Sequence, residues 1–300
     1  MQVGYIGLGV MGSALARRLS LSRPLHVFDL NANALTSLVG AGARAASSPA
    51  ALAAESDTVM LCLPRSSDVR IALFGEDGVV RGLKPGAIII DQTSGDPGET
   101  RKMAAELSNH DIHLIDAPVS GGAQGAEAGT IAIMVGGDDE QVLRVRPILE
   151  EISPNIFHCG GVGSGQVMKL VNNTISASNR FVMLEAVAMG VRNGLDIHTM
   201  ADVLNSGGAR SRASESLLPA IARGEPDSFF LLSLMLKDLN LSTQLAIETG
   251  VPLQFGQLTR SMLQMALNAF GPEANYFDIS KLVAAQAGIR FKSHPRGENS

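Results

Sequence analysis

Val3-Gly-Tyr-Ile-Gly7-Leu-Gly9-Val-Met-Gly12 is the stretch that decides the fold of this 300-residue chain. An apolar run ends in three glycines with the spacing GxGxxG, and an amphipathic helical pattern follows up to Leu21. A strand, a glycine turn and a helix form the opening unit of a dinucleotide-binding domain. A second apolar run ends at Asp29, 22 residues after Gly7, close to the spacing of about 20 expected for the acidic residue of such a unit.

The three glycines have different expected roles. Gly7 permits the tight turn out of the strand, Gly9 lets a pyrophosphate approach the backbone, and Gly12 lets the helix pack against the strand. Phosphates are favoured at the helix N-terminus by its unpaired N–H groups and its dipole. The alternative is a purely structural turn. The expected cofactor contacts in this turn are Gly7, Leu8, Gly9, Val10, Met11 and Gly12.

Asp29 indicates which dinucleotide binds. Its carboxylate would accept hydrogen bonds from both hydroxyls of the adenosine ribose, with Leu30 beside it. The same charge would repel a ribose phosphate, and no Arg or Lys lies between Leu30 and Ala34. The sequence therefore predicts NAD in preference to NADP.

Composition excludes several classes of protein. The chain is 45% hydrophobic and 18% charged, as in ordinary globular proteins. A net charge of −5 with 4% aromatic residues does not suit a nucleic-acid surface. No uncharged run reaches the roughly 18 residues of a membrane span, and the histidines show no HExxH-like pair, so neither a membrane protein nor a metal site is expected. Two cysteines fit the reduced cytoplasm.

Strand and helix patterns alternate over residues 1–161, which predicts an α/β fold, a Rossmann-type doubly wound parallel sheet. Only helical patterns follow, so residues 162–291 are expected to form an all-α C-terminal domain, with a polar tail at 292–300. A long helix is expected at about 164–192. Further helices are expected at 197–206, 214–223, 229–248, 251–269 and 278–287.

Three polar or Pro-containing stretches follow predicted strands: Leu63-Pro64, Asp91-Gln-Thr-Ser94 and Asp116-Ala-Pro-Val-Ser-Gly-Gly122. In open α/β sheets the carboxyl ends of the strands border the ligand crevice, so these stretches are expected to line it. Ser120, Gly121 and Gly122 would offer a hydroxyl and backbone N–H groups to a carboxylate. The alternative is an ordinary strand-to-loop turn.

The long helix carries a polar stripe, because Lys169, Asn172, Asn173 and Ser176 recur at spacings of three and four. A Lys in apolar surroundings has a lowered pKa and can act as a general acid or base. The alternative is that Lys169 reaches solvent near the helix start. The apolar residues expected to bury most of this helix are Val167, Leu170, Val171, Ile175, Val182 and Leu184.

Lys237 is a second candidate cation, since it begins Lys-Asp-Leu-Asn-Leu within another apolar helix. If Lys237 lies near the same crevice, it would lower the pKa of Lys169 and attract an anionic substrate. The alternative is a pair with a surface carboxylate.

Together these motifs resemble the β-hydroxyacid dehydrogenase family, which includes 3-hydroxyisobutyrate dehydrogenase, tartronate semialdehyde reductase, and threonate and serine dehydrogenases. The resemblance extends from Gly4 to Asp278-Ile-Ser and rests on five ordered motifs. These are Gly7-Leu-Gly-Val-Met-Gly12, Leu63-Pro64, Asp116-Ala-Pro-Val-Ser-Gly-Gly122 with Gly129-Thr130, Gly163-Ser-Gly-Gln-Val-Met-Lys-Leu-Val-Asn-Asn173, and Lys237-Asp-Leu.

The resemblance implies a role for each motif. Lys169 is the catalytic acid and base, Ser120 to Gly122 and Asn173 hold the substrate, Leu63, Pro64 and Ser94 border the cofactor, and Lys237 lies beside the nicotinamide and the substrate. The implied reaction moves a hydride between NAD and a small β-hydroxy acid such as 3-hydroxyisobutyrate, glycerate (from tartronate semialdehyde), threonate or serine. The long helix would join the domains, and subunits would pair through the helical domain as a homodimer or homotetramer.

Two points stay open at this level. Arg210 and Arg212 lie in a loop where related sequences differ, so one of them could bind a second carboxylate, a phosphate or a sulfonate, or both could be solvated surface. Two other functions compete: a non-catalytic NAD(H)-binding redox sensor, and an imine-reductase-like enzyme, which typically lacks the lysine at position 169.

Overall fold

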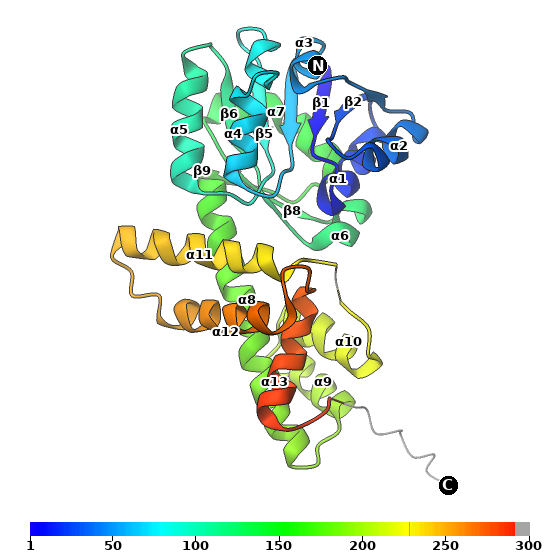
Figure 1. Ribbon diagram of the computed structural model, residues 1–300, viewed down its shortest axis with the longest axis vertical. Coiled ribbons are helices and arrows are strands. Elements are labelled where there is room, and N and C mark those ends of the chain that lie inside the picture. Colours follow the sequence, from blue (N-terminus) through cyan, green and yellow to red (C-terminus); the bar gives the residue numbers. More distant parts are fainter. Residues whose placement is uncertain (228, 292–300) are drawn as a thin grey trace. The chain divides into compact units, whose positions relative to one another are not determined.

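The computed structural model describes residues 1–227 and 229–291, and the chain divides into two compact units (Figure 1). The first unit is Met1–Lys169 and the second is Leu170–Ser300. The polar tail expected at 292–300 lies outside the described residues.

Within the described residues, the first unit is built on one sheet with the strand order β3-β2-β1-β4-β5-β6-β8-β7, and β9 lies beside β8. Strands β1 to β6 pair in parallel, as expected of a doubly wound sheet. They are β1 (Val3–Ile6), β2 (Leu25–Phe28), β3 (Arg44–Ala45), β4 (Thr58–Leu61), β5 (Ile88–Asp91) and β6 (His113–Asp116).

The sheet is not parallel throughout. β8 (Ala132–Gly136) pairs antiparallel with β6 and with the two-residue strand β7 (Val119–Ser120), whereas β9 (Ile156–Gly160) is parallel to β8. A short helix, α6 (Gly122–Ala128), connects β7 to β8. Antiparallel neighbours need only a short connection, and elements of two and seven residues leave little periodic pattern in a sequence.

Helices cover both faces of the sheet. α1 (Val10–Ser20), α2 (Ala32–Gly40), α6 and α7 (Asp139–Ile152) contribute to one apolar cluster. α3 (Pro49–Ala54), α4 (Ser66–Phe74), α5 (Pro97–Ser108) and the short η1 (Val79–Arg81) contribute to another. Ile88 and Ile90 of β5 pack in the first cluster and Ile89 in the second, because successive side chains of a strand point to opposite faces.

The second unit is all helical in its described part, as expected, apart from one isolated bridge. α8 (Ser164–Arg192) begins in the first unit and continues into the second. It is followed by α9 (Ile197–Ser206), the π-helical η2 (Ala213–Leu217), α10 (Leu218–Arg223), α11 (Leu232–Thr249), α12 (Gln254–Phe270), η3 (Tyr276–Asp278) and α13 (Ile279–Ala287). None of the helices in residues 1–227 and 229–291 has the length and apolar character to cross a bilayer.

Three helix boundaries differ from the sequence prediction. α11 begins at Leu232 rather than 229, because Leu231 forms a bridge with Asn275 and the Phe230 carbonyl accepts from the Tyr276 N–H. The helix expected at 214–223 is divided between η2 and α10, and Pro219, which has no N–H for a helical ladder, lies at this junction. α12 begins at Gln254, after Pro252.

A buried ion pair holds the second unit together. Arg180 of α8 donates to both carboxylate oxygens of Asp227, and the two side chains are 10% and 4% exposed. The Arg180 guanidinium also lies 4.6 Å from the centre of the Tyr276 ring. One cation therefore ties α8 to the segment after α10 and to η3.

We expect Asp227→Ala to lower the free energy of unfolding by about 3–5 kcal/mol, because Arg180 would remain charged and buried without its partner. Urea unfolding followed by circular dichroism measures this loss. Glu215→Ala is the control, since it removes the partner of the exposed Arg210 and should cost less than about 1 kcal/mol. Equal losses in the two variants would contradict the structural role of the buried pair.

Candidate functional site

The glycine turn between β1 and α1 has the geometry that its sequence predicts. Gly7 has φ +92°, which L side chains rarely adopt. A Cβ on Gly12 would lie 1.9 Å from the Gly7 carbonyl oxygen, so only glycine allows α1 to start this close to β1. A Cβ on Gly9, by contrast, would meet no atom within 4 Å. The turn thus leaves open space at the start of α1, as a bound pyrophosphate requires.

Neighbouring residues of the turn differ in exposure. Leu8 is buried in the first apolar cluster, Met11 packs partly against it, and Val10 is exposed. α1 has no side-chain cap, because its N-cap residue is Gly9. An anion could therefore approach the first-turn N–H groups without displacing a capping side chain.

Asp29 lies directly beside the glycine turn, at the carboxyl end of β2. One carboxylate oxygen accepts from the Leu8 N–H at 2.5 Å, and the other accepts from the Asn31 N–H at 2.7 Å. Each oxygen keeps a further lone pair, so a ribose hydroxyl could still donate to it. Leu30 is almost fully exposed.

The ends of β1, β4 and β5 lie together at one edge of the sheet. A Cβ on Gly7 would lie 2.3 Å from the Cys62 carbonyl oxygen and 2.8 Å from a methyl of Leu63. The Leu63 N–H donates to the Thr93 hydroxyl at 3.0 Å. The structure therefore brings Leu63-Pro64 and the loop that carries Ser94 next to the glycine turn.

Ser120, Gly121 and Gly122 form a strand-to-helix turn. Ser120 pairs with Ala132 of β8, and Gly122 begins α6. Gly121 and Gly122 have φ +140° and +71°, and both are exposed. This backbone can present N–H groups to a carboxylate, as the sequence suggests.

The polar stripe of α8 is connected to α11. Lys169 and Asn172 are half-buried, and Asn173 is buried. The Asn173 amide donates to Asp238 at 2.6 Å, and its oxygen accepts from Asn172 at 2.9 Å. The Lys237 Nζ lies 3.1 Å from the other oxygen of Asp238.

Asp238 is a candidate site residue that the sequence analysis did not select. Its carboxylate is buried and links Asn173 with Lys237, so the carboxylate beside Lys237 is not at the surface. The signal was present, because Lys237 and Asp238 form a polar pair within an otherwise apolar helical stretch.

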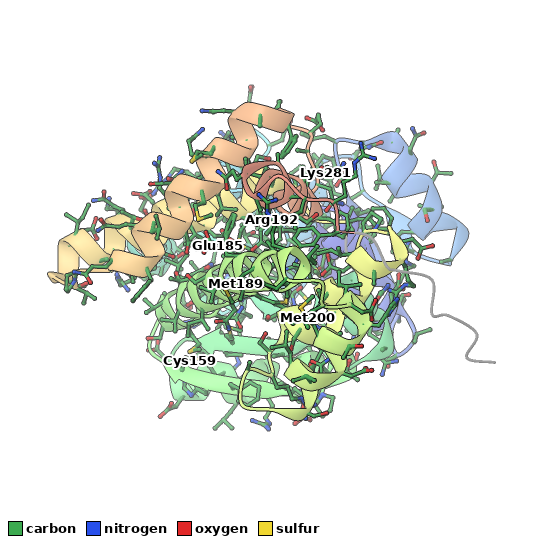
Figure 2. The ribbon with its side chains drawn as sticks, turned by 90° about the horizontal axis from the view of Figure 1, so that it is seen from below. Cys159, Glu185, Met189, Arg192, Met200 and Lys281 are labelled. Carbon is green, nitrogen blue, oxygen red and sulfur yellow. The ribbon has the colours of Figure 1, made fainter. Side chains whose placement is uncertain are left out.

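The burial expected for α8 was partly wrong. Leu170 and Leu184 are buried, but Val171, Ile175 and Val182 are 45%, 55% and 62% exposed. Met189, labelled in Figure 2, continues this face at the same spacing and is also exposed. An apolar pattern around a whole helix does not distinguish the side that packs in the core from a side left outside it.

The start of α8 is bonded to a buried carboxylate. Asp116, the last residue of β6, is inaccessible to solvent and accepts from the backbone N–H groups of Gly163 and Gln166 at 2.6 and 2.8 Å. Burial raises the pKa of Asp116 to about 6, although these N–H donors act in the opposite direction. Partial burial of Cys159, together with the nearby charge of Asp116, raises the pKa of the Cys159 thiol.

Arg210 and Arg212 are both exposed. Arg210 forms an ion pair with Glu215 at 2.7 Å. This exposure favours solvated surface over a ligand contact for Arg210 and Arg212.

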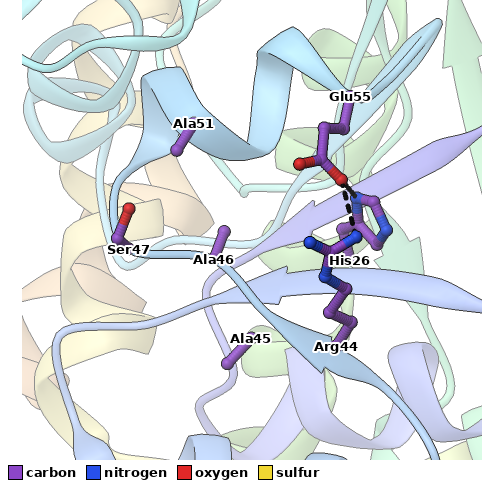
Figure 3. A pocket seen from close by; sticks show the side chains of 7 residues that line it. All are labelled: His26, Arg44, Ala45, Ala46, Ser47, Ala51 and Glu55. Carbon is purple, nitrogen blue, oxygen red and sulfur yellow. Dashed lines mark hydrogen bonds and ion pairs between the residues drawn. The ribbon is translucent and has the colours of Figure 1, made fainter.

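A separate pocket of about 230 Å³ lies between β2, β3 and α3 (Figure 3). Within it Glu55 lies 3.0 Å from Arg44 and 3.5 Å from His26 Nδ1. None of its lining residues is among those expected to bind the cofactor or the substrate: they are His26, Arg44, Ala45, Ala46, Ser47, Ala51 and Glu55.

Two family models match the chain along most of its length. Residues 2–161 match the NAD binding domain of 6-phosphogluconate dehydrogenase. Residues 163–283 match the NAD-binding domain of NADP-dependent 3-hydroxyisobutyrate dehydrogenase.

Individual relatives agree with these models. A probable mitochondrial 3-hydroxyisobutyrate dehydrogenase from Dictyostelium discoideum is 37% identical, over 85% of this chain and 82% of that protein. The NAD-dependent L-serine dehydrogenase of Pseudomonas aeruginosa is 35% identical, over 94% and 97%. The solved structure of Psf3 in complex with NADP+ and 2-OPP superposes with a TM-score of 0.87 at 28% identity, over 94% of this chain and 99% of that one.

We expect Gly9→Ala to lower the affinity for NADH and Gly12→Ala to lower the stability of the fold. A methyl on Gly9 meets no protein atom, so stability should stay within about 0.5 kcal/mol while affinity for NADH falls at least about tenfold. A methyl on Gly12 collides with the Gly7 carbonyl, so Gly12→Ala should lose about 1–3 kcal/mol of stability or more. Thermal unfolding and NADH fluorescence titration measure the two effects. Wild-type NADH affinity in Gly9→Ala would contradict the binding role of the turn.

Proposed function

Because the chain belongs to the β-hydroxyacid dehydrogenase family, we propose that it moves a hydride between NAD and a small β-hydroxy acid, with Lys169 as the proton carrier. Family membership makes the chain an oxidoreductase of hydroxy acids that uses a nicotinamide cofactor. The observation that supports the role of Lys169 best is its half-buried place on α8, three residues after Gln166, whose side chain bonds the loop that carries Ser94.

The substrate carboxylate is proposed to bind at Ser120, Gly121 and Gly122. The exposed glycine backbone at the start of α6 supports this assignment. Asn173 and Lys237 are proposed to contact the substrate as well, Lys237 also lying at the nicotinamide end. Their shared contact with Asp238 supports treating them as one group.

In the proposed mechanism the hydride passes to or from the cofactor, and Lys169 transfers the proton. The bound nicotinamide cofactor supplies the hydride acceptor in oxidation and the hydride donor in reduction. In oxidation, neutral Lys169 takes the proton from the β-hydroxyl oxygen as the carbon loses its hydride, so a carbonyl forms. In reduction, protonated Lys169 donates the proton to the carbonyl oxygen.

NAD is proposed as the preferred cofactor. Asp29 is held by two backbone N–H groups beside the glycine turn, and the next residues, Leu30 to Ala32, carry no positive charge for a ribose phosphate. The glycine turn, Leu63, Pro64 and Ser94 are proposed to border the rest of the cofactor. The Psf3 structure shows that a relative of the same fold accommodates NADP+.

The other two functions are not favoured. The matched relatives are named as dehydrogenases of hydroxy acids, and a redox sensor would have no need for a lysine on the polar stripe of α8. An imine-reductase-like activity fits the architecture but not Lys169.

We propose that the protein assembles as a homodimer or homotetramer through its helical unit. Val171, Ile175, Val182 and Met189 form one apolar, exposed face of α8. Next to its C-terminal part, a groove of about 420 Å³ lies between α8 and α13. Exposed apolar side chains gathered on one face of a helix are typical of protein interfaces.

A cytoplasmic location is also proposed, on the basis of cysteine usage. Two cysteines in 300 residues are what a reduced compartment favours.

We expect Lys169→Ala to lower kcat by at least about 10²-fold, because the β-hydroxyl loses its proton acceptor. Lys169→Arg should be equally poor, since a guanidinium keeps its proton. The assay uses a panel of short β-hydroxy acids with NAD and with NADP, and follows absorbance of the reduced cofactor; activity should be higher with NAD. NADH should still bind Lys169→Ala.

Lys102→Ala is the matched control, because Lys102 is an exposed lysine of the same unit, paired with Glu99. It should keep wild-type kcat. Retention of more than about a tenth of kcat in Lys169→Ala would defeat the assignment of the acid and base.

We expect Val182→Glu to shift the protein to a smaller species in analytical ultracentrifugation, because a charge would be buried at the interface. Leu143→Glu is the control: Leu143 is equally exposed but lies on α7 of the first unit. An unchanged sedimentation coefficient in Val182→Glu would place the interface elsewhere.

A further inference from the structure

The first turn of α8 is hydrogen-bonded to residues that lie far from it in the sequence. A helix start leaves several N–H groups unpaired. Here Gly163 and Gln166 donate theirs to the two oxygens of Asp116, which precedes them by 47 and 50 residues. A single carboxylate at the end of β6 therefore holds the backbone at the start of α8.

The fit around this carboxylate is close. A Cβ on Gly136 would lie 2.6 Å from one oxygen of Asp116, and a Cβ on Gly165 would lie 2.8 Å from the other. The same Cβ on Gly165 would lie 2.4 Å from the Met134 carbonyl oxygen. Glycines on β8 and α8 thus let the two elements approach the carboxylate, and a longer side chain would not fit.

Gln166 makes a second connection from the same turn. Its side chain is fully buried; its amide nitrogen donates to the Thr93 carbonyl at 2.7 Å, and its amide oxygen accepts from the Gly95 N–H at 2.8 Å. The amide therefore bonds the backbone on both sides of Ser94. Thr93 in turn accepts from Leu63, so the connection extends to the end of β4.

We propose that Asp116 and Gln166 are positioning residues for the reaction, because they fix the start of α8 and hence the point from which Lys169 reaches the substrate. This inference rests on the proposed role of Lys169. Lys169 follows Gln166 by three residues, so it lies one turn further on the same side of the helix. Neither positioning residue touches the reacting atoms. Their effect is geometric, and a misplacement of about 1 Å can reduce a rate by about 10²-fold.

Asp116→Asn and Gln166→Leu test this proposal. In Asp116→Asn an N–H group replaces one acceptor, so kcat should fall about 10²-fold while KM for NAD changes less than about threefold. Gln166→Leu should lower kcat similarly and also raise KM for NAD, because the backbone around Ser94 loses two bonds. In both variants the deuterium isotope effect on kcat, measured with substrate labelled at the reacting carbon, should rise as hydride transfer becomes rate-limiting.

Two matched controls separate positioning from general stability. Asp196→Asn makes the same change at the start of α9, where Asp196 accepts from the Thr199 N–H. Gln141→Leu makes the same change at another buried glutamine of the first unit. Both controls should keep the wild-type isotope effect and kcat within about twofold. The proposal would be overturned if Asp116→Asn and Gln166→Leu lost thermal stability but matched the controls in kcat and isotope effect.

Hydrogen exchange of the wild-type enzyme gives a test that no folding defect can obscure. The amides of Gly163 and Gln166 should be among the slowest to exchange in residues 160–170, and exchange as fast as in exposed loops would overturn the proposal. Failure of the two proposals is distinguishable. If Lys169→Ala is active while the amides of Gly163 and Gln166 are protected, the proposed function is wrong. If Lys169 is essential but Asp116→Asn and Gln166→Leu behave like the controls, only the positioning role is wrong.

Discussion

The parallel pairing of β1, β4, β5 and β6 is the constraint on which the candidate site depends. Helices cover both faces of these strands, so the side chains of the strands pack in two apolar clusters. Only the strand ends are left for polar chemistry, and parallel strands place those ends at one edge. The glycine turn, Leu63-Pro64, the Ser94 loop and Asp116 consequently come together although they span more than a hundred residues of sequence.

Polar groups buried at this edge are arranged in bonded sets rather than singly. Thr93 joins Leu63 to Gln166, and Asp116 takes up the N–H groups at the start of α8. In the second unit Asp238 has the same function for Asn173 and Lys237. Burying a polar group costs free energy unless the group is hydrogen-bonded, and hydrogen bonds shared among buried groups make their arrangement more rigid. These buried hydrogen bonds therefore fix the backbone positions of the candidate site residues.

The sequence predicted the parts of the molecule that depend on local pattern. The glycine turn, the alternation of strands and helices in the first unit, the span of α8 and the helical second unit follow from spacing and periodicity. What it could not predict depends on pairing across the chain. Asp116 and Gln166 look like ordinary motif residues until their partners, 50 and 73 positions away, are known. The exposed face of α8 was mistaken for core because an apolar residue looks the same in either place.

Asp29 has two roles, because the side chain expected to select the dinucleotide also holds the glycine turn in place. Its carboxylate stands where the ribose is expected, and it also accepts from the Leu8 N–H inside the glycine turn. Replacing Asp29 with a smaller or basic residue to admit a phosphorylated dinucleotide would therefore release the turn at the same time. Redesign of this protein toward the phosphorylated coenzyme would need another hydrogen-bond acceptor for the Leu8 N–H. A lineage that exchanged Asp29 by a single substitution would pass through a protein whose glycine turn is less firmly held.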